Sequence, residues 1–277
     1  MKTWLITGVS KGLGKQIAKQ VLDQGDRVVG TVRSEKDSAE FSLMDAERAI
    51  PLLLDVSRFD EVPEKIRDAE EKHGPFGVLV NNAGYGLTGA IEEVRIDDVK
   101  ALFDVNVVGV IAVTQAVLPG MRRRRAGHII NISSVSGLAP WAGTGVYGAS
   151  KYALECLGQT LADEVAPLGI HVTNVAPGGM RTDFAGGSLR ATSASIPDYE
   201  TTAHVAHQVL TGGKGREPSA PEKIALVISQ LVDMSVPPRL LLLGEDAYKY
   251  ATTHLKGQLD GIEAFKELTL SVSAETV

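Results

Sequence analysis

A tyrosine and a lysine four residues apart, Tyr147 and Lys151, are the residues in this sequence best suited to acid–base chemistry. Side chains four residues apart on a helix share one face, so these two would lie side by side. A free tyrosine has a pKa of about 10, too high for ready proton exchange at neutral pH. A neighbouring ammonium stabilises the phenolate and lowers that pKa. The pair therefore predicts a phenolic acid/base with its own activator, although a solvated tyrosine beneath a lysine stem has the same spacing.

A glycine-rich turn near the amino end predicts a dinucleotide site. The apolar segment 2–7 has the β-branched residues of a buried strand, and helical periodicity begins at Lys15. Between them, Gly8 would allow a tight turn, Gly12 a close approach to a pyrophosphate, and Gly14 helix–strand packing. The helix N-terminus would then offer free N–H groups to the anion. The spacing is Gly-x-x-x-Gly-x-Gly rather than the commoner Gly-x-Gly-x-x-Gly, and an ordinary strand–helix turn remains an alternative.

Two further apolar strands end in small or polar residues. The segment 78–84 ends in Asn-Asn-Ala-Gly, whose amides could tie the strand to its neighbours and leave room for a ribose or nicotinamide. An Asx turn that terminates a strand would look the same. The segment 128–134 ends in two serines, and Ser134 comes thirteen residues before Tyr147. A serine hydroxyl there could donate a hydrogen bond to a carbonyl oxygen that gains negative charge, or it could cap the next element.

Taken together, these motifs resemble the short-chain dehydrogenase/reductase family of the compact single-domain type. The resemblance covers roughly residues 1–185 and depends on the order and spacing of the motifs rather than on any one of them. It implies NAD(P)-dependent oxidation of an alcohol or reduction of a ketone or aldehyde. The matching residues are Thr7, Gly8, Gly12, Gly14, Asp55, Val56, Asn81, Asn82, Ala83, Gly84, Asn106, Ser134, Tyr147, Lys151, Pro177, Gly178 and Thr182.

The resemblance implies a role for each matching position. Tyr147 would exchange a proton with the substrate oxygen, Lys151 would lower the phenol pKa and bond the nicotinamide ribose, and Ser134 would polarise the carbonyl. Asn106 would sit at a helix irregularity and hold a water that links Lys151 to solvent, unless it simply faces solvent. Cofactor contacts are expected from Gly8, Ser10, Lys11, Gly12, Leu13, Gly14, Arg33, Asp55, Val56, Asn82, Ala83, Gly84, Tyr147, Lys151, Pro177, Gly178 and Thr182.

The end of the second predicted strand bears on which dinucleotide binds. An NAD site usually presents an acidic residue there to the ribose 2′-hydroxyl. This chain has Val32 and then Arg33 at that point, and Lys11 lies inside the glycine turn. Two cations without a carboxylate suit a 2′-phosphate, which arginine binds in bidentate fashion, although both could be solvated surface charges. We therefore predict NADP as cofactor, with NADPH preferred over NADH.

Apolar strands and amphipathic helices alternate from residue 2 to about 176. This alternation predicts an α/β fold, a Rossmann-type doubly wound parallel sheet covered on both faces. Ligands of such folds bind beyond the carboxyl ends of the strands, where the motifs fall. We expect strands at 3–7, 27–32, 50–55, 77–82, 126–132, 170–175 and 239–243, and helices at 12–24, 58–73, 95–118 and 145–166.

We expect a single domain over residues 1–277, with a substrate lid at about 179–220 and a C-terminal helical tail at about 244–277. A long glycine- and serine-rich segment with a helical stretch near 198–210, placed after a cofactor-contacting strand, is a candidate lid. The tail and the strand end at 31–33 resemble the 17β-hydroxysteroid and retinol dehydrogenase branch, which implies a lipophilic alcohol or ketone. Candidate apolar lining residues, each equally explicable as core, are Val135, Leu138, Trp141, Met180, Phe184 and Tyr199.

Composition limits the other possibilities. The 277 residues are 44% hydrophobic, enough for one large domain with a substantial core, and the net charge of −6 offers no broad basic surface for nucleic acid. The sequence has no run of about eighteen apolar residues, so we expect no membrane span. The first strand begins too early to leave room for a secretory signal, so we do not expect export. The single cysteine, Cys156, excludes an internal disulfide and suits a cytoplasmic location. The scattered histidines show no metal-ligand spacing, so we expect no metal.

Several functions use such a scaffold. A 3-oxoacyl thioester reductase would need the same residues, whereas a non-catalytic dinucleotide-binding regulator would be favoured by a change at Tyr147, Lys151 or Ser134, all of which are present. A sugar-nucleotide epimerase or dehydratase usually has a longer substrate domain and a Gly-x-x-Gly-x-x-Gly turn, and this sequence has neither. The expected helices 95–118 and 145–166 resemble the family's dimer surface, so we expect a homodimer or homotetramer that acts on a small-molecule alcohol or carbonyl substrate.

Overall fold

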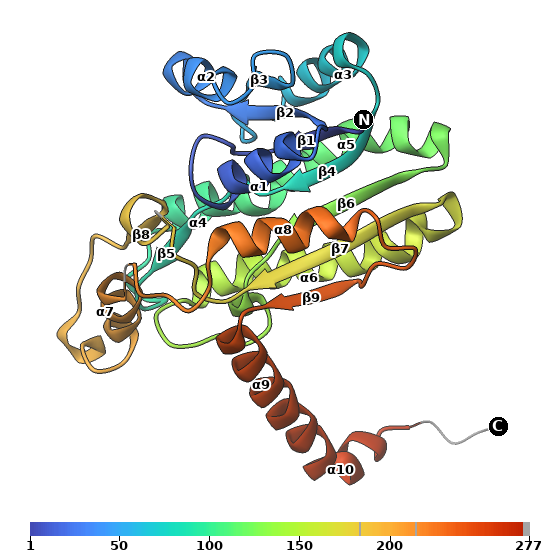
Figure 1. Ribbon diagram of the computed structural model, residues 1–277. Helices are drawn as coiled ribbons and strands as arrows, with labels where there is room; N and C mark the ends of the chain where they lie inside the picture. Colours follow the sequence, from blue (N-terminus) through green and yellow to red (C-terminus); the bar gives the residue numbers. More distant parts are fainter. Residues whose placement is uncertain (183, 214, 274–277) are drawn as a thin grey trace.

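Seven parallel strands form the central sheet in the order β3-β2-β1-β4-β6-β7-β9 (Figure 1). The computed structural model describes residues 1–182, 184–213 and 215–273. The chain winds outward from β1 in one direction and from β4 in the other, so the strand order reverses between them. The predicted Rossmann-type α/β fold is confirmed. The strands are β1 (Thr3–Ile6), β2 (Arg27–Val32), β3 (Ala49–Leu53), β4 (Phe76–Asn81), β6 (Gly127–Ile132), β7 (Ile170–Pro177) and β9 (Leu240–Leu243).

Helices cover both faces of the sheet because successive strand side chains point to opposite sides and both sides are apolar. On β1, Trp4 and Ile6 pack into one core and Leu5 into the other. The first core is shared with α1 (Gly12–Asp23) and α8 (Pro221–Leu231). The second is shared with α3 (Val62–His73), α5 (Gly109–Arg124) and α6 (Gly145–Val165).

The helices follow the sequence expectations with local differences. The stretch expected as one helix over 95–118 is α4 (Ile96–Phe103) and α5, joined by a π-helical turn at Asp104–Val108. Helix α3 begins at Val62 rather than 58 and has Pro63 in its first turn, where a missing N–H costs nothing. The short α2 (Glu35–Ser42) and the core helix α8 were not expected.

The segment 179–220 returns to the carboxyl end of β4 before it enters α8. It contains β8 (Leu189–Ala191), which pairs in parallel with β5 (Gly86–Thr88) just after β4, and then α7 (Ala203–Gly212). Figure 1 shows β5, β8 and α7 together at one end of the sheet. This end is also where the strands of the sheet finish, so the segment lies where a lid is expected.

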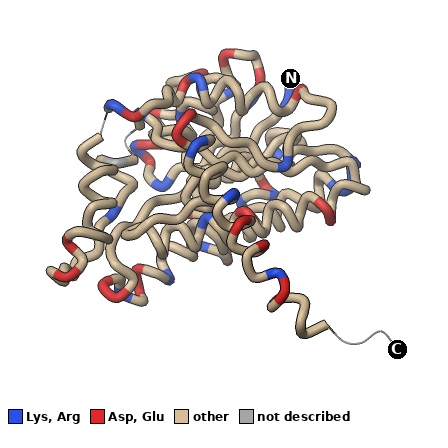
Figure 2. Tube along the Cα trace, turned by 90° about the horizontal axis from the view of Figure 1, so that it is seen from below, with Lys and Arg blue, Asp and Glu red and all other residues tan. Residues whose placement is uncertain are grey.

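The chain after β9 forms an arm rather than another layer of the domain. Helix α9 (Glu245–Ala264) packs Ala247 and Ala251 against the body, and α10 (Lys266–Leu270) continues it. Figure 1 shows α9 extending away from the sheet, and Figure 2 shows both charge signs along this arm. The predicted helical tail thus forms, while its last residues, 274–277, lie outside the described residues.

One helical stretch, Ile96–Arg124, is long and apolar enough by length and composition to cross a membrane. Its side chains Leu102, Val113 and Val117 are fully buried within the protein, as in the core helix of a globular domain. The sequence analysis did not expect such a stretch, because the polar residues Asn106, Thr114 and Gln115 interrupt its apolar residues. The predicted cytoplasmic location and the predicted lack of a membrane span stay predictions.

Candidate active site

A cleft of about 440 Å³ opens at the carboxyl ends of the central strands. Residues that follow β1, β2, β3, β4 and β6 line it, together with the start of α6 and part of the segment 179–220. It includes the crevice between β1 and β4, where the strand order reverses. Open α/β sheets bind ligands at this point.

The glycine turn after β1 has the backbone that the sequence predicts. Gly8 and Gly12 have φ angles of +73° and +58°, a left-handed conformation that side chains other than glycine rarely adopt. A Cβ atom on Gly14 would overlap the Gly8 carbonyl oxygen and the Asn82 side chain. Helix α1 begins at Gly12, which itself lines the cleft, so a helix N-terminus lies at the cleft wall and suits a phosphate.

Asn82 braces this turn from the neighbouring strand. Its Nδ2 donates to the carbonyl oxygens of Thr7 and Gly8 at 2.8 and 3.1 Å. The Thr7 hydroxyl accepts from the backbone N–H groups of Asn82 and Ala83, both at 2.9 Å. The sequence left open whether the asparagines tie neighbouring strands together or form an Asx turn. The structure shows that Asn82 ties the ends of β1 and β4 together, and that Ala83 and Gly84 line the cleft.

Tyr147 and Lys151 both line the cleft from the first turns of α6. The Lys151 Nζ atom lies 5.9 Å from the centre of the Tyr147 ring and donates to the Ile132 carbonyl oxygen at 2.9 Å. Lys151 is buried, whereas Tyr147 is partly exposed to the cleft. The predicted side-by-side arrangement on one helix face is therefore present.

The expected lowering of the Tyr147 pKa is wrong for this structure. Burial raises the pKa of the Tyr147 phenol because it disfavours the phenolate, and the Ser134 side chain only partly offsets this. Burial also lowers the pKa of Lys151 to about 8, against the opposing charge of Glu155. The phenol is therefore protonated at neutral pH, which suits a proton donor.

Ser134 stands at the end of β6 and begins the next turn. Its Oγ atom accepts from the backbone N–H of Ser136 at 3.1 Å, so it caps the 3₁₀ turn Val135–Gly137. The same side chain is close enough to lower the pKa of Tyr147. Ser134 therefore caps the next turn, as one alternative expected, and its side chain also lies beside Tyr147.

Asn106 is buried in the π-helical turn and does not face solvent. Its Nδ2 donates to the Tyr85 carbonyl oxygen at 3.0 Å and to the Ser150 hydroxyl at 3.1 Å, and its Oδ1 accepts from the Tyr85 N–H at 3.1 Å. A Cβ on Gly84 would come within 3.0 Å of Asn106 Oδ1 and 3.6 Å of Lys151 Nζ. Gly84 therefore keeps open the space between these two side chains.

Most of the predicted cofactor residues line the cleft, with three exceptions. Gly14 lies behind the glycine turn, where it permits the contact with Asn82. Pro177 pairs with Leu243 on β9, and Gly178 donates to the Leu243 carbonyl oxygen at 2.9 Å, so both belong to the sheet edge. The predicted cofactor residues that line the cleft are Gly8, Ser10, Lys11, Gly12, Leu13, Arg33, Asp55, Val56, Asn82, Ala83, Gly84, Tyr147, Lys151 and Thr182.

The predicted cations lie at different parts of the cleft. Arg33 follows β2 and lines the cleft. Burial raises the pKa of the Asp55 carboxyl, but hydrogen bonds from Ser57 and the nearby charge of Arg33 lower it, and the pKa is lowered overall. Lys11 donates from Nζ to the Gly187 carbonyl oxygen at 3.2 Å. Lys11 is exposed, and this hydrogen bond links the glycine turn to the segment 179–220.

The segment 179–220 adds side chains that face Tyr147. The Phe184 ring lies 6.1 Å from the Tyr147 ring, and Met180 lines the same cleft. The other candidate lining residues do not: Val135 and Leu138 pack towards α9, Trp141 is 39% exposed, and Tyr199 donates to Glu92. Pocket residues cannot be told from other apolar residues by type alone, which is why four of these six assignments are wrong.

Tyr85 and Arg190 are among the cleft residues that the sequence analysis missed. The Arg190 guanidinium lies 4.5 Å from the centre of the Tyr85 ring, and both residues line the cleft. Tyr85 directly follows the Asn-Asn-Ala-Gly motif, so its position was a usable signal. Arg190 reaches the site through the pairing of β8 with β5, for which the sequence carries no motif.

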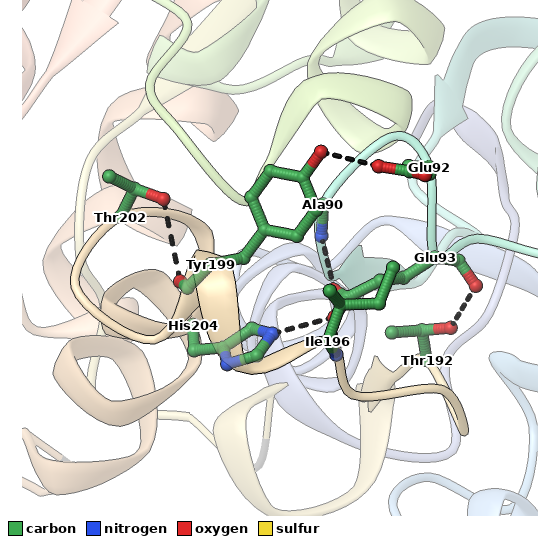
Figure 3. A network of polar contacts seen from close by, with 8 residues as sticks. All are labelled: Ala90, Glu92, Glu93, Thr192, Ile196, Tyr199, Thr202 and His204. Atoms are coloured by element: carbon green, nitrogen blue, oxygen red, sulfur yellow. Dashed lines mark hydrogen bonds and ion pairs between the residues drawn. The ribbon is translucent and has the colours of Figure 1, made fainter.

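A buried carboxylate fastens the far part of the segment 179–220 (Figure 3). The Glu93 side chain accepts from the backbone N–H groups of Ile196 at 2.6 Å and Ala90 at 2.9 Å, and it pairs with His204 Nε2 at 2.8 Å. The Thr192 hydroxyl donates to the Glu93 carbonyl oxygen at 2.8 Å. This network connects residues about a hundred positions apart and has no sequence motif.

Comparison with known proteins agrees with this geometry. The family described as short chain dehydrogenase matches residues 2–192. An oxidoreductase of Botryotinia fuckeliana, BOA17, is 37% identical over 271 residues, 98% of each chain. The crystal structure of a short-chain dehydrogenase from Streptomyces avermitilis superposes with a TM-score of 0.93 at 35% identity, covering 98% of each chain.

Another similar structure contains a dinucleotide. An alcohol dehydrogenase from Thermococcus sibiricus, complexed with 5-hydroxy-NADP, has a TM-score of 0.71 and 25% identity, and the match covers 88% of this chain and 96% of that one. The protein belongs to the short-chain dehydrogenase family. It is an oxidoreductase that depends on a nicotinamide dinucleotide.

Proposed function

We propose that the protein interconverts a secondary alcohol and a ketone, or a primary alcohol and an aldehyde, on a lipophilic small molecule, with Tyr147 as the acid/base. The observation that carries this proposal is the position of Tyr147 on the cleft wall, with Lys151 5.9 Å from its ring. The raised pKa of Tyr147 keeps the phenol protonated, as donation to a carbonyl oxygen requires.

The cleft residues fit a dinucleotide. The left-handed glycine turn at the start of α1 suits a pyrophosphate, and the opening that Gly84 leaves between Asn106 and Lys151 suits a ribose. We propose that the predicted residues that line the cleft hold the cofactor, and that Lys151 bonds its ribose hydroxyls. When bound, the nicotinamide supplies or accepts the hydride.

The remaining residues orient the reacting oxygen. Ser134 follows β6 by two residues and lies beside Tyr147, and we propose that its hydroxyl donates a hydrogen bond to the substrate oxygen as negative charge builds there. The Lys151 ammonium stabilises that charge through the phenol. Asn106 is held on both sides by Tyr85 and Ser150, and in the proposal it fixes the surroundings of Lys151.

A lipophilic substrate is supported by the apolar side chains around the phenol. Phe184 lies beside Tyr147, and Met180 lines the same cleft. Tyr85 packs with Tyr147 against a small apolar cluster. Burial of such surface favours binding by about 25 cal/mol per Å². In the proposal, residues 179–220 act as the substrate lid, which Glu93 and Lys11 hold in place.

We propose NADP rather than NAD as the preferred cofactor. Thr31, Val32 and Arg33 line the cleft at the end of β2, where an NAD site would have a carboxylate. Replacement of Arg33 by alanine is expected to weaken NADPH binding by about 1.5–3 kcal/mol, roughly ten- to a hundredfold, and to leave NADH binding almost unchanged. Fluorescence titration of both cofactors measures this. A wild-type catalytic efficiency that is higher with NADH would contradict the proposal.

One observation favours a second candidate, reduction of a 3-oxoacyl thioester. The exposed Arg190 guanidinium at the cleft suits the phosphates that thioester carriers bring. The two candidates differ in the preferred substrate, so kcat/KM for a 3-oxoacyl thioester can be compared with that for a neutral ketone of equal chain length. Arg190→Gln lowers the first selectively only if the carrier binds there.

The test of the proposed function is a carbonyl screen that follows NADPH absorbance with steroids, retinoids, aldehydes and β-ketoesters. We expect turnover of at least one lipophilic carbonyl by the wild type. NADPH binding without turnover across the whole panel would overturn the proposal and favour a dinucleotide-binding regulator.

A further inference from the structure

Helix α6 carries a third polar side chain in line with the proposed catalytic pair. Glu155 follows Lys151 by four residues, as Lys151 follows Tyr147, so the three side chains share one helix face. Lys151 is 6% exposed and Glu155 is 3% exposed. Two opposite charges one turn apart therefore point into the protein, and the mechanism proposed above does not use Glu155.

A ladder of three asparagine amides, Asn81, Asn131 and Asn174, crosses the sheet and ends at Glu155. These residues lie opposite one another on β4, β6 and β7. Asn81 Nδ2 donates to Asn131 Oδ1, Asn131 Nδ2 to Asn174 Oδ1, and Asn174 Nδ2 to Glu155 Oε2, each at 2.9 Å. All the donors point towards the carboxylate, and hydrogen bonds aligned in this way stabilise its charged form.

The helix comes close enough to the sheet for this contact because residue 158 is a glycine. A Cβ atom at Gly158 would overlap the side-chain amide of Asn174. Asn174 Nδ2 also donates to the Glu155 backbone carbonyl oxygen at 3.0 Å. Both ends of the Glu155 residue are thereby fixed to β7.

The second carboxylate oxygen of Glu155 has no hydrogen-bond partner within the described residues, although it is buried. A buried carboxylate oxygen left in this way is costly unless a charge compensates it. Burial raises the pKa of Glu155, while the side chains of Ser133, Asn174 and Gln159, and after them the charge of Lys151, lower it. The charge of Glu155 in turn opposes the lowering of the Lys151 pKa by burial.

The surroundings of the pair supply few other charges. Glu155 is the charged side chain that shifts the pKa of Lys151. The groups that face the pair are Tyr147 and Gln159 on α6, Asn106 in the π-helical turn, the Ile132 carbonyl oxygen and Ser133 on β6, and Asn174 on β7.

We infer that Glu155 is a positioning residue whose buried carboxylate, held by the asparagine ladder, keeps the Lys151 side chain charged while Tyr147 exchanges its proton. The inference rests on the proposed function, because it gives Glu155 a role through Lys151. Glu155 itself touches neither substrate nor cofactor. Its removal should change the pH range of activity more than the maximal rate.

The test is the pH profile of kcat for carbonyl reduction by NADPH in wild type, Glu155→Gln and Glu164→Gln. Glu164→Gln removes the same charge from an exposed position on α6 and is the matched control. In Glu155→Gln the alkaline fall in kcat is expected to begin about one pH unit lower, since a buried opposite charge one helical turn away shifts a pKa by about that much. At pH 6.5 its kcat should stay within about threefold of wild type, because Lys151 is still charged.

A purely structural role predicts a different result. If Glu155→Gln lowers the melting temperature but leaves the alkaline limb in place, the inference is overturned. If that variant does not fold, Gln159→Lys decides, because residue 159 is exposed and a lysine there competes for the Glu155 carboxylate. Its alkaline limb should also move to lower pH, and an unmoved limb overturns the inference. Absence of wild-type turnover would reject the proposed function first, and this inference with it.

Discussion

The floor of the cleft and the segment that covers it are held by different kinds of contact. The floor is formed by the ends of β1, β4 and β6 and the start of α6, and its polar groups are buried and bonded to one another across neighbouring strands. The covering segment, 179–220, is attached by the short β5–β8 pairing, by Lys11 and by the carboxylate of Glu93. The floor is fixed through the sheet, whereas the cover depends on a few side chains.

This difference separates two tasks. Groups that must keep a fixed geometry for proton and hydride transfer lie on the sheet, where local opening costs most. Residues that contact the variable part of a substrate lie on the cover, which can change without disturbing the floor. Variants of the floor should therefore affect chemistry and cofactor binding, and variants of the cover should affect substrate affinity.

The largest expected effect comes from Tyr147→Phe in the floor. The variant keeps the ring beside Phe184 and removes the proposed proton donor. We expect kcat to fall by about 10²–10⁴-fold, the usual contribution of a positioned acid/base. NADPH affinity, measured by fluorescence titration, should stay within about threefold of wild type. Equal turnover by the two proteins would remove the phenol from the mechanism.

A backbone change in the floor should be nearly as damaging. In Gly14→Ala the new methyl group overlaps the Gly8 carbonyl oxygen and Asn82, so the glycine turn must move. We expect a loss of about 1–3 kcal/mol in stability, typical of overpacking, together with loss of NADPH binding. Gly257→Ala on the exposed arm is the control, because no atom lies within 4 Å of the added carbon. Thermal melts should show that the control variant is as stable as wild type or slightly more stable. If Gly14→Ala kept the stability and the NADPH affinity of the wild type, the floor would not be rigid.

In the cover, Glu93→Ala should act on substrate binding. It leaves the Ile196 and Ala90 N–H groups without their acceptor, which costs roughly 1–3 kcal/mol in the attachment of the segment. We expect KM to rise about tenfold, with kcat changed less than threefold, and faster proteolysis within 192–204. Glu164→Ala, which removes an exposed carboxylate from α6, is the control. A fall in kcat at constant KM would place Glu93 among the floor residues.

The effect that is smallest near neutral pH is a pH dependence that also belongs to the floor. The pKa of Lys151 is about 8, so its ammonium, needed beside the phenol, is lost above that pH. The kcat for carbonyl reduction should be constant from about pH 6 to 7 and fall about tenfold per unit well above pH 8. Stopped-flow reduction rates across this range measure it. A constant rate up to pH 10 would mean that Lys151 need not be charged.

The floor could be predicted from the sequence largely because its residues belong to short motifs at strand ends. Gly8, Gly12 and Gly14 are required by backbone geometry, and the Tyr147–Lys151 spacing fixes their relation on a helix. The direction of the Tyr147 pKa shift was not predictable in the same way. It depends on burial by segments distant in the sequence, which outweighs the opposing effect of the Ser134 side chain.

The contacts that hold the cover could not be predicted because they join distant residues that carry no motif. Glu93 meets Ile196 across about a hundred positions, and Arg190 reaches Tyr85 only through the β5–β8 pairing. The sequence predicted a strand at 239–243 but not its register against β7, and the contact of Pro177 with the nicotinamide stays a prediction.

A crystal structure of the protein with NADP⁺ tests the account most directly. The account predicts the pyrophosphate at the first turn of α1, the 2′-phosphate beside Arg33, and the nicotinamide between Tyr147 and the end of β6. A dinucleotide bound outside this cleft, or one whose nicotinamide points away from the Tyr147 hydroxyl, would contradict it.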